Sequence, residues 1–383
     1  MFKIDSTYTL LLIILIIVGF LYYKYDEKLS KERRDFDYDA IQLYLLNENE
    51  IDLEQSKKPI MWIHIVNDYN ARMWESFGSR SSHHLNQPYL YLTIKSIISR
   101  CEDSFHICLI DDDSFEKLIP GWDINMKIIS APILDNIRQL GLTKLLHKYG
   151  GILVPPSFLC MKNLIEMYEI GTRHDKMFVC ETVDRNITST THQLYPNIHF
   201  MGSRKNNHTL VELINVMENI ISKDQTAQSV FLGNMNRWVK YKCDEGKIHL
   251  FDGKLVGTKT LDDEPILIDD LMNNSYIKLY SNTYGIYIPA DDVLSRKKYA
   301  WFARLSPQQV LESKIIISKY ILVANIPTKQ GRIEAYEGEN EAIINQNVKY
   351  WKVPLQAPVW GLMPNGLNDN VLPNTSGSAN FNG

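Results

Sequence analysis

From residue 58 to residue 325, short apolar runs alternate with longer segments in which apolar residues recur every three or four positions. The short runs are typical of buried strands, whereas the longer spacing is typical of amphipathic helices. Strands that are separated by helices are joined by crossovers, and crossovers favour parallel pairing. The sequence therefore predicts an α/β domain with a largely parallel sheet and flanking helices.

The pattern places the expected elements along this region. The expected strands are 61–66, 106–111, 126–129, 152–154, 177–181 and 198–201, and the expected helices are 88–100, 132–148, 207–222 and 307–320. Gly150 and Gly151 end the second of these helices, because glycine tolerates the left-handed conformation found at helix ends. Regular patterning stops near residue 325.

An uninterrupted apolar run, residues 10–21, lies near the N-terminus between Tyr8 and Tyr23. As a helix, the segment from Tyr8 to Tyr23 spans roughly 24 Å against a hydrocarbon layer of about 30 Å, and Lys3 and Lys24 can extend to the interface. No small-x-small cleavage site follows the run, which favours an uncleaved anchor over a signal peptide or a buried helix. We expect a single-pass membrane protein, in contact with the lipid membrane through Tyr8–Tyr23.

Charge predicts the orientation of this anchor. The cations after the run are Lys24, Lys28, Lys31, Arg33 and Arg34, whereas only Lys3 and the amino terminus precede it. The more positive flank of a membrane helix stays in the cytoplasm, so we expect the domain to face the cytoplasm. Five cysteines without a CxxC pair indicate neither a disulfide framework nor a thiolate zinc site, as expected in a reducing compartment.

The chain divides by composition into an anchor (1–24), a charged stalk (25–57), the α/β domain (58–325) and an extended C-terminal arm (326–383). The arm is rich in Pro, Asn and Gly and carries scattered large apolar residues, so we expect it to bind protein partners. With 41 Lys and Arg against 45 Asp and Glu, the chain has no surplus of positive charge for nucleic acid, and we expect no nucleic-acid partner.

A helix, the triplet Tyr149-Gly150-Gly151, and an apolar strand follow one another in residues 145–164. Three further segments, 58–64, 107–113 and 195–201, match the order of strands in a known family. Together they resemble glycosyltransferases of the sugar-binding Asp-X-Asp, or capsular polysaccharide synthesis, type. The resemblance covers roughly residues 58–250 and implies a glycosyltransferase-like domain with the glycosyltransferase A-like, Rossmann-like fold.

The same resemblance implies that the catalytic residues are lost. In the family, the two aspartates of Asp-X-Asp hold Mn²⁺ or Mg²⁺, which neutralises the departing nucleotide diphosphate. Here Pro155 and Ser157 occupy those positions, and neither supplies a carboxylate. Gln139 and Leu142 stand where the family has an acid and an arginine. Losing about 4 kcal/mol of transition-state stabilisation slows a reaction roughly a thousandfold.

We therefore expect no catalytic residues, no metal and no cofactor, but the remnant of a nucleotide-sugar site. Its residues are His64, Asp111, Asp113, Tyr149, Gly150, Gly151, Pro155 and Ser157. A replacement metal site at the acidic run 111–113 is the alternative, although such runs are more typical of loops and helix caps. His64 lies mid-strand among apolar neighbours, which is typical of a buried structural histidine.

The expected function is that of a membrane-anchored, glycosyltransferase-like pseudoenzyme with a structural or tethering role. Abundant Ile, Asn and Lys together with this domain are similar to proteins of nucleocytoplasmic large DNA viruses, whose particles carry a membrane beneath a capsid. That resemblance implies a minor capsid protein in the inner membrane of the virion, with the arm on capsid proteins. The alternatives are an active, nucleotide-sugar-dependent glycosyltransferase that modifies glycans or glycoproteins with Mn²⁺ or Mg²⁺, and a lectin-like module.

Overall fold

The computed structural model describes residues 18–22, 24–25, 53, 57–65, 87–129, 133–184, 189, 192–223, 228–296 and 298–326. The chain forms two compact units, Met1–Leu45 and Leu46–Gly383. In the first unit, residues 18–22 and 24–25 are helical. No helix among the described residues is long and apolar enough to cross a membrane. Most of the predicted anchor and stalk, and the predicted arm beyond residue 326, lie outside the described residues.

The second unit is built on a six-stranded sheet with the order β2-β1-β3-β6-β5-β7. The strands are β1 (Ile60–His64), β2 (His106–Ile110), β3 (Gly151–Leu153), β5 (Met177–Val183), β6 (Leu194–Ser203) and β7 (Ile248–Phe251). β1 pairs in parallel with β2 and β3, and β5 pairs in parallel with β7. β6 is antiparallel to both of its neighbours, β3 and β5. The predicted α/β class with a mostly parallel sheet is therefore confirmed.

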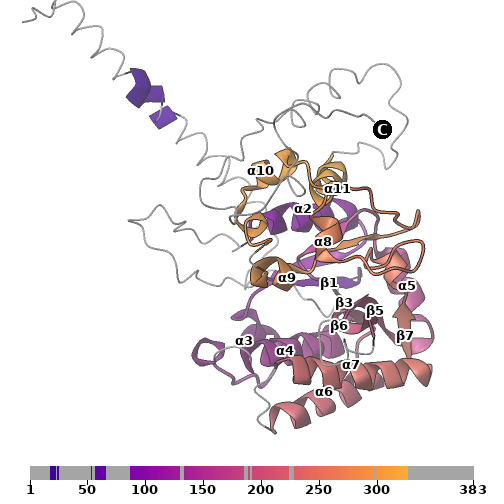
Figure 1. Cartoon of the computed structure of the whole chain (residues 1–383). Coiled ribbons are helices and arrows are strands. Elements are labelled where there is room, and N and C mark those ends of the chain that lie inside the picture. The colour runs from indigo at the N-terminus through magenta and orange to yellow at the C-terminus, as the bar shows by residue number, and fades with distance from the viewer. Residues whose placement is uncertain are drawn as a thin grey trace, which may run out of the picture. The chain divides into compact units, whose positions relative to one another are not determined.

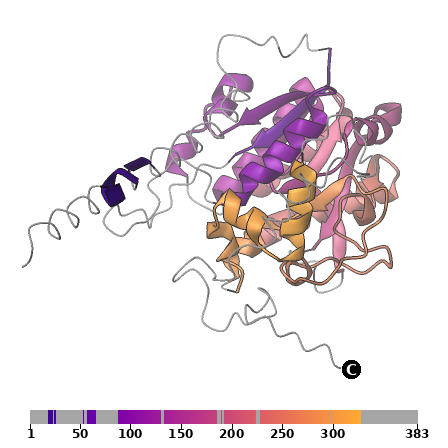
Figure 2. The ribbon, with the colours of Figure 1, turned by 90° about the horizontal axis from the view of Figure 1, so that it is seen from above.

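Helices cover both faces of this sheet (Figure 1). On one face lie α4 (Ile133–Tyr149), α6 (His208–Ile221) and α7 (Gln228–Asp244), together with the short α3 (Ser114–Leu118). On the other lie α2 (Tyr89–Cys101), α10 (Pro307–Glu312) and α11 (Ile316–Asn325), which Figure 2 shows side by side. Because both faces are covered, the central residues of β1, Met61 to Ile63, are fully buried.

Smaller elements complete the unit. β4 (Phe158–Cys160) and β8 (Gly285–Tyr287) form a two-stranded antiparallel sheet, and β4 packs on α2. The remaining α-helices among the described residues are α5 (Ile165–Gly171), α8 (Ile268–Leu271) and α9 (Ala290–Ser295). All five cysteines are free thiols, and the sulfur atoms of Cys101 and Cys160 lie 3.9 Å apart.

Two predicted elements are wrong. Residues 126–129, expected as a strand, form the 3-10 helix Met126–Ile128. The side chain of Asn125 accepts a hydrogen bond from the backbone N–H of Lys127 (3.1 Å), and Ile128 is 80% exposed, so this apolar run is not covered as a central strand would be. The helix expected over 307–320 is divided into α10 and α11, because Ser313 and Ile315 adopt extended backbone conformations.

Candidate functional site

The carboxyl ends of the parallel strands β1, β2 and β3 lie at one edge of the sheet, here called the carboxyl edge. His64 ends β1 and pairs in register with Ile110, which ends β2. Asp111, Asp112 and Asp113 follow directly, and Pro155 lies two residues beyond the end of β3. Ligands of open α/β sheets bind outside these strand ends, so this edge is the candidate functional site.

Asp112 is the centre of a polar network that joins β1, the β2–α3 turn and α4. Its Oδ1 atom lies 3.0 Å from Nε2 of His64. Arg138, on α4, donates from Nη2 to Asp112 Oδ2 at 2.7 Å and from Nε to Oδ1 at 2.9 Å. Its Nη1 atom donates to Asp135 Oδ1 at 2.9 Å, one helical turn away. The fork of the guanidinium thus holds both carboxylates at once.

The electrostatics of this network favour its charged form. Burial by itself raises the pKa of Asp112, but hydrogen bonds from His64 and Arg138 lower that pKa well below its usual range. Burial likewise acts to lower the pKa of Arg138, and the bonds to Asp112 and Asp135 raise it. The His64 ring is only 8% exposed and stacks on Phe115, with ring centroids 5.5 Å apart. The network is a fixed set of hydrogen bonds between packed elements, with ion pairs from Arg138 to Asp112 and Asp135.

The two neighbours of Asp112 also have partners. Asp111 Oδ1 accepts hydrogen bonds from the backbone N–H (3.0 Å) and the hydroxyl (2.7 Å) of Ser114, the first residue of α3. Asp113 forms an exposed ion pair with Lys127 at 3.1 Å. Asp111 therefore fixes the turn that leads into α3, and Asp113 lies on the surface.

The two residues that the resemblance aligns with Asp-X-Asp lie in the packed interior. Pro155 and Ser157 are both buried. The carbonyl of Pro155 accepts a hydrogen bond from the N–H of Phe158 at 3.0 Å, which closes a tight turn into β4. The carbonyl of Ser157 accepts from the N–H of Ile288 at 3.3 Å. The turn is thus fastened to the small sheet, with the side chains of Pro155 and Ser157 buried.

The triplet Tyr149-Gly150-Gly151 lies at the opposite end of the strands, here called the amino edge, because Gly151 begins β3. Gly150 has φ +74° and Gly151 has φ +106°. A Cβ atom on Gly151 would lie 2.0 Å from the carbonyl oxygen of Ile60, and one on Gly150 would lie 2.7 Å from the backbone nitrogen of Lys205. Both glycines let backbones approach closely. This close approach explains the Gly-Gly pair, with no need for a catalytic or binding role.

The structure thus divides the eight predicted site residues between the two edges. His64, Asp111, Asp113, Pro155 and Ser157 lie at the carboxyl edge, whereas Tyr149, Gly150 and Gly151 lie at the amino edge. The two positions where the family has an acid and an arginine are part of the packing: Gln139 donates from Nε2 to the carbonyl of Ile198 at 3.2 Å, and Leu142 is buried.

Sequence reasoning missed Asp112, Asp135 and Arg138. Asp135 and Arg138 lie four residues, or about one helical turn, before Gln139 and Leu142 on the same helix. An acid and an arginine at i and i+3 on a helix next to the Tyr-Gly-Gly triplet were the available signal. Among the described residues, no group of three His, Cys, Asp or Glu side chains is placed to hold a metal ion. At the carboxyl edge, the carboxylates of residues 111–113 are bonded to donor groups of the protein itself.

Comparison with known proteins adds no relatives. No protein-family model matches the chain, and no match to a curated protein was found.

Proposed function

We propose that residues 58–325 form a glycosyltransferase-like domain that does not transfer sugars, in a membrane-anchored protein with a structural or tethering role. The observation that carries this proposal is the burial of Pro155 and Ser157 at the Asp-X-Asp positions. A metal-bound nucleotide diphosphate needs carboxylate ligands that face an open site. A buried proline and a buried serine supply neither the ligands nor the access.

The sheet supports the glycosyltransferase-like part of the proposal. One antiparallel strand, β6, lies between β3 and β5 in an otherwise parallel sheet, and a small second sheet begins just after the Asp-X-Asp positions. A mostly parallel sheet of this kind is what a glycosyltransferase A-like fold requires. The bonding of the acidic run supports the absence of sugar transfer. Asp111 is bonded to Ser114, and Asp112 is bonded to His64 and Arg138. A replacement metal site would have to displace these partners.

A turnover assay tests the loss of chemistry. The full-length protein, purified in detergent, is incubated with a panel of nucleotide sugars and Mn²⁺, and release of the nucleotide diphosphate is measured. We expect no release above the rate without protein, and no change in melting temperature on adding Mn²⁺. Turnover that disappears in Asp111→Asn or Asp113→Asn but persists in Asp244→Asn, which changes only an exposed ion pair, would establish the active-transferase alternative instead.

A binding assay separates the tethering role from the lectin-like alternative. Free nucleotide sugars and simple glycans are titrated into the same preparation, and the melting temperature is recorded. A tether gives no shift with any of them, whereas a lectin-like module is stabilised without turnover because a ligand that binds only the folded state raises the melting temperature. For the proposed role in a virion, mass spectrometry of purified particles of the source virus detects the protein; its absence would reject that role.

A further inference from the structure

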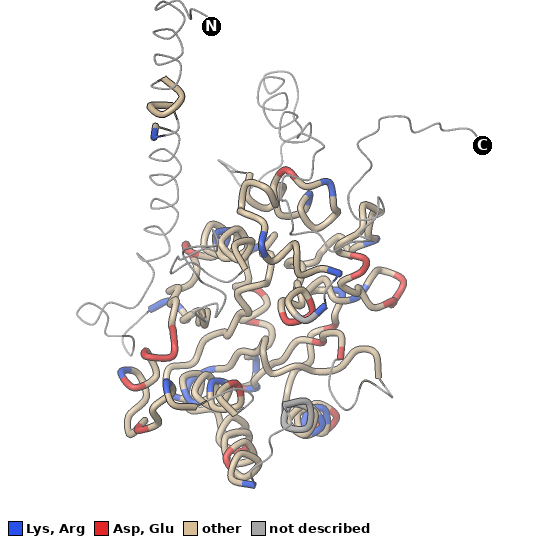
Figure 3. The backbone as a smooth tube through the Cα atoms, turned by 60° about the vertical axis from the view of Figure 1, so that its left-hand side comes forward, with Lys and Arg blue, Asp and Glu red and all other residues tan. Residues whose placement is uncertain are grey.

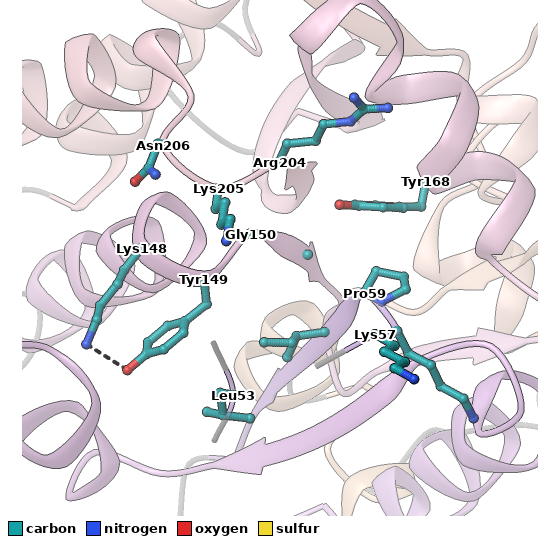
Figure 4. Close-up of a pocket in the computed structure, with 13 residues that line it drawn as sticks. Leu53, Lys57, Pro59, Lys148, Tyr149, Gly150, Tyr168, Arg204, Lys205 and Asn206 are labelled. Atoms are coloured by element: carbon teal, nitrogen blue, oxygen red, sulfur yellow. Dashed lines mark hydrogen bonds between the residues drawn. The ribbon is translucent and has the colours of Figure 1, made fainter. Parts of the chain in front are cut away.

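A pocket of about 590 Å³ opens at the amino edge, where β1 and β3 begin and β6 ends (Figure 4). Its described lining comes from five parts of the chain: residues 53, 57–60, 148–151, 168 and 204–206. A volume of this size is typical of pockets that hold small molecules. The crowded backbones at Gly150 and Gly151 form one wall of the pocket.

The lining is strongly positive. Five of its residues are cationic, namely Lys57, Lys58, Lys148, Arg204 and Lys205, and no Asp or Glu is among the described residues that line it. The whole chain carries a net charge of -4, and Lys and Arg are interspersed with Asp and Glu along the rest of the backbone trace (Figure 3). Like charges gathered around one volume repel one another and create a positive potential, which a bound anion relieves.

Two of these cations are held in place by hydrogen bonds. Lys148 Nζ donates to the carbonyl of Leu118 at 3.2 Å and to the hydroxyl of Tyr149 at 2.8 Å, and that hydroxyl donates to the same carbonyl at 2.9 Å. Lys58 Nζ donates to the carbonyl of Glu102 at 3.2 Å. These bonds fix where the two ammonium groups lie.

The other three cations, Lys57, Arg204 and Lys205, are exposed, and no salt bridge joins them to a carboxylate within the described part of the chain. Arg204 lies near the hydroxyl of Tyr168: burial raises the pKa of Tyr168, and the positive charge of Arg204 opposes that rise. Figure 4 shows Lys148 and Tyr149 on one side of the pocket and Arg204 and Tyr168 on the other. Cationic residues thus line the pocket on both sides, and the hydroxyls of Tyr149 and Tyr168 donate to the backbone carbonyls of Leu118 and Ser203.

One feature of the pocket opposes an anion. The carboxyl end of α4, which carries partial negative charge, points toward it. Two of the terminal carbonyls are already bonded, because Gly150 N–H donates to Leu146 O and Asn206 N–H donates to His147 O. What remains of the helix dipole weakens anion binding roughly two- to fivefold, which is small beside the attraction of five cations.

We infer that this pocket binds a small anion with two or more phosphate groups, either free in solution or as the headgroup of a lipid. Lysine and arginine are the side chains that bind phosphate, and cations on several sides favour a ligand with several phosphates over a monoanion. A free anion and a lipid headgroup would present the same phosphate groups to the pocket. The inference goes beyond the proposed function, since the pocket lies at the end of the sheet opposite the Asp-X-Asp positions and requires no sugar transfer.

The test is calorimetric titration of the full-length protein in detergent. The probes are tripolyphosphate, inositol 1,4,5-trisphosphate and a short-chain lipid with that headgroup. We expect binding that weakens as the salt concentration is raised, because salt screens the attraction between the pocket cations and the phosphate groups of the probe. Equal affinity for the free headgroup and the lipid identifies a soluble ligand, and a clear preference for the lipid identifies a membrane headgroup.

A charge-matched pair of variants locates the binding. The triple variant Lys57→Gln, Arg204→Gln and Lys205→Gln removes pocket cations, and each lost charge-assisted contact lowers the affinity about tenfold, so we expect a loss of at least about a hundredfold. The control triple, Lys95→Gln, Lys127→Gln and Lys223→Gln, removes the same charge outside the pocket lining and should bind as the wild type does. Both variants are checked by thermal melting.

Two results would overturn the inference: no binding of any probe to the wild type, or equal losses in the two triple variants, which would mean that only net charge matters. If the pocket triple does not fold, Lys205→Gln alone replaces it, with about a tenfold loss expected and Lys223→Gln as its control. Because none of these measurements involves turnover, the inference and the proposed absence of sugar transfer fail or survive independently.

Discussion

The two ends of the central sheet differ in how their charges are used. At the carboxyl edge, Asp112 is held by His64 and Arg138, so the charges are neutralised within the protein. At the amino edge, five cations surround a pocket of about 590 Å³, and no acid is among its described lining residues. At the carboxyl edge the carboxylates are bonded between packed elements, whereas the charged residues of the described pocket lining at the amino edge are all cationic.

The two edges also differ in how their residues shape the backbone. In the Tyr-Gly-Gly triplet, Gly150 and Gly151 allow backbones to meet at the amino edge. Beyond the end of β3, the carbonyls of Pro155 and Ser157 accept hydrogen bonds that fasten the turn into β4. Each half of the comparison can be tested by substitution.

The largest expected effect is at Gly151. In Gly151→Ala the new Cβ would lie 2.0 Å from the carbonyl oxygen of Ile60, and a backbone atom cannot rotate away as a side chain can. We expect a loss of at least about 4 kcal/mol in the free energy of unfolding, or failure to fold. Urea denaturation followed by circular dichroism measures it.

The control for this substitution is Gly246→Ala. Gly246 also has a positive φ, +74°, but a Cβ there would meet nothing within 4 Å. Its loss should be only about 1–2 kcal/mol, the ordinary penalty of a left-handed residue. Similar losses in the two variants would show that the close approach of β1 and β3 does not need a glycine.

The next effect is at the carboxyl edge. Arg138→Met removes the cation that holds Asp112 and Asp135 and leaves two partly buried carboxylates close together. We expect a loss of about 2–3 kcal/mol, somewhat below that for a fully buried pair because Asp112 is 25% exposed. Lys127→Met, which removes the exposed partner of Asp113, should lose less than about 0.5 kcal/mol in the same urea experiment. Equal losses would mean that the network contributes no more than a surface ion pair.

Some elements of the fold could be predicted from the sequence, and others could not. β1 and β2 were predicted closely because each is a short apolar run between polar residues. The direction of β6 could not be predicted, because it depends on how the chain returns to the sheet and not on local pattern. Residues 126–128 failed for a related reason: an apolar run resembles a strand whether or not a partner strand lies beside it.

The candidate site, too, could be predicted only in part from the sequence. The absence of carboxylates at positions 155 and 157 was visible in the sequence. The pairing of Arg138 with Asp112 was not, because it joins residues 26 positions apart through the packing of α4 on the sheet. The basic pocket gave no local signal at all, since its cations come from residues 57–58, 148 and 204–205 and meet only in the folded chain.

A third prediction concerns pH. The pKa of Asp112 is lowered on folding, so its contribution to stability is complete above the unfolded value, near 4, and is lost as the pH falls through the lower folded value. Arg138→Met removes much of this lowering. We therefore expect the stability difference between wild type and Arg138→Met to be full at pH 7 and to shrink steadily below about pH 4. Urea midpoints measured from pH 7 to pH 2 check this; a constant difference over that range would contradict the ion-pair account.

The smallest expected effect is at the amino edge without ligand. Lys205→Gln removes one of several like charges around the pocket, so it should leave the free energy of unfolding unchanged or raise it by up to about 0.5 kcal/mol at low salt. Lys144→Gln removes a lysine that pairs with Glu218 at 2.7 Å, and it should shift the free energy by a similar amount in the opposite direction. Both shifts should vanish in 1 M salt, where screening acts within about 3 Å. A clear destabilisation by Lys205→Gln would show that this cation has a structural partner, and the two edges would then differ less than their charges imply.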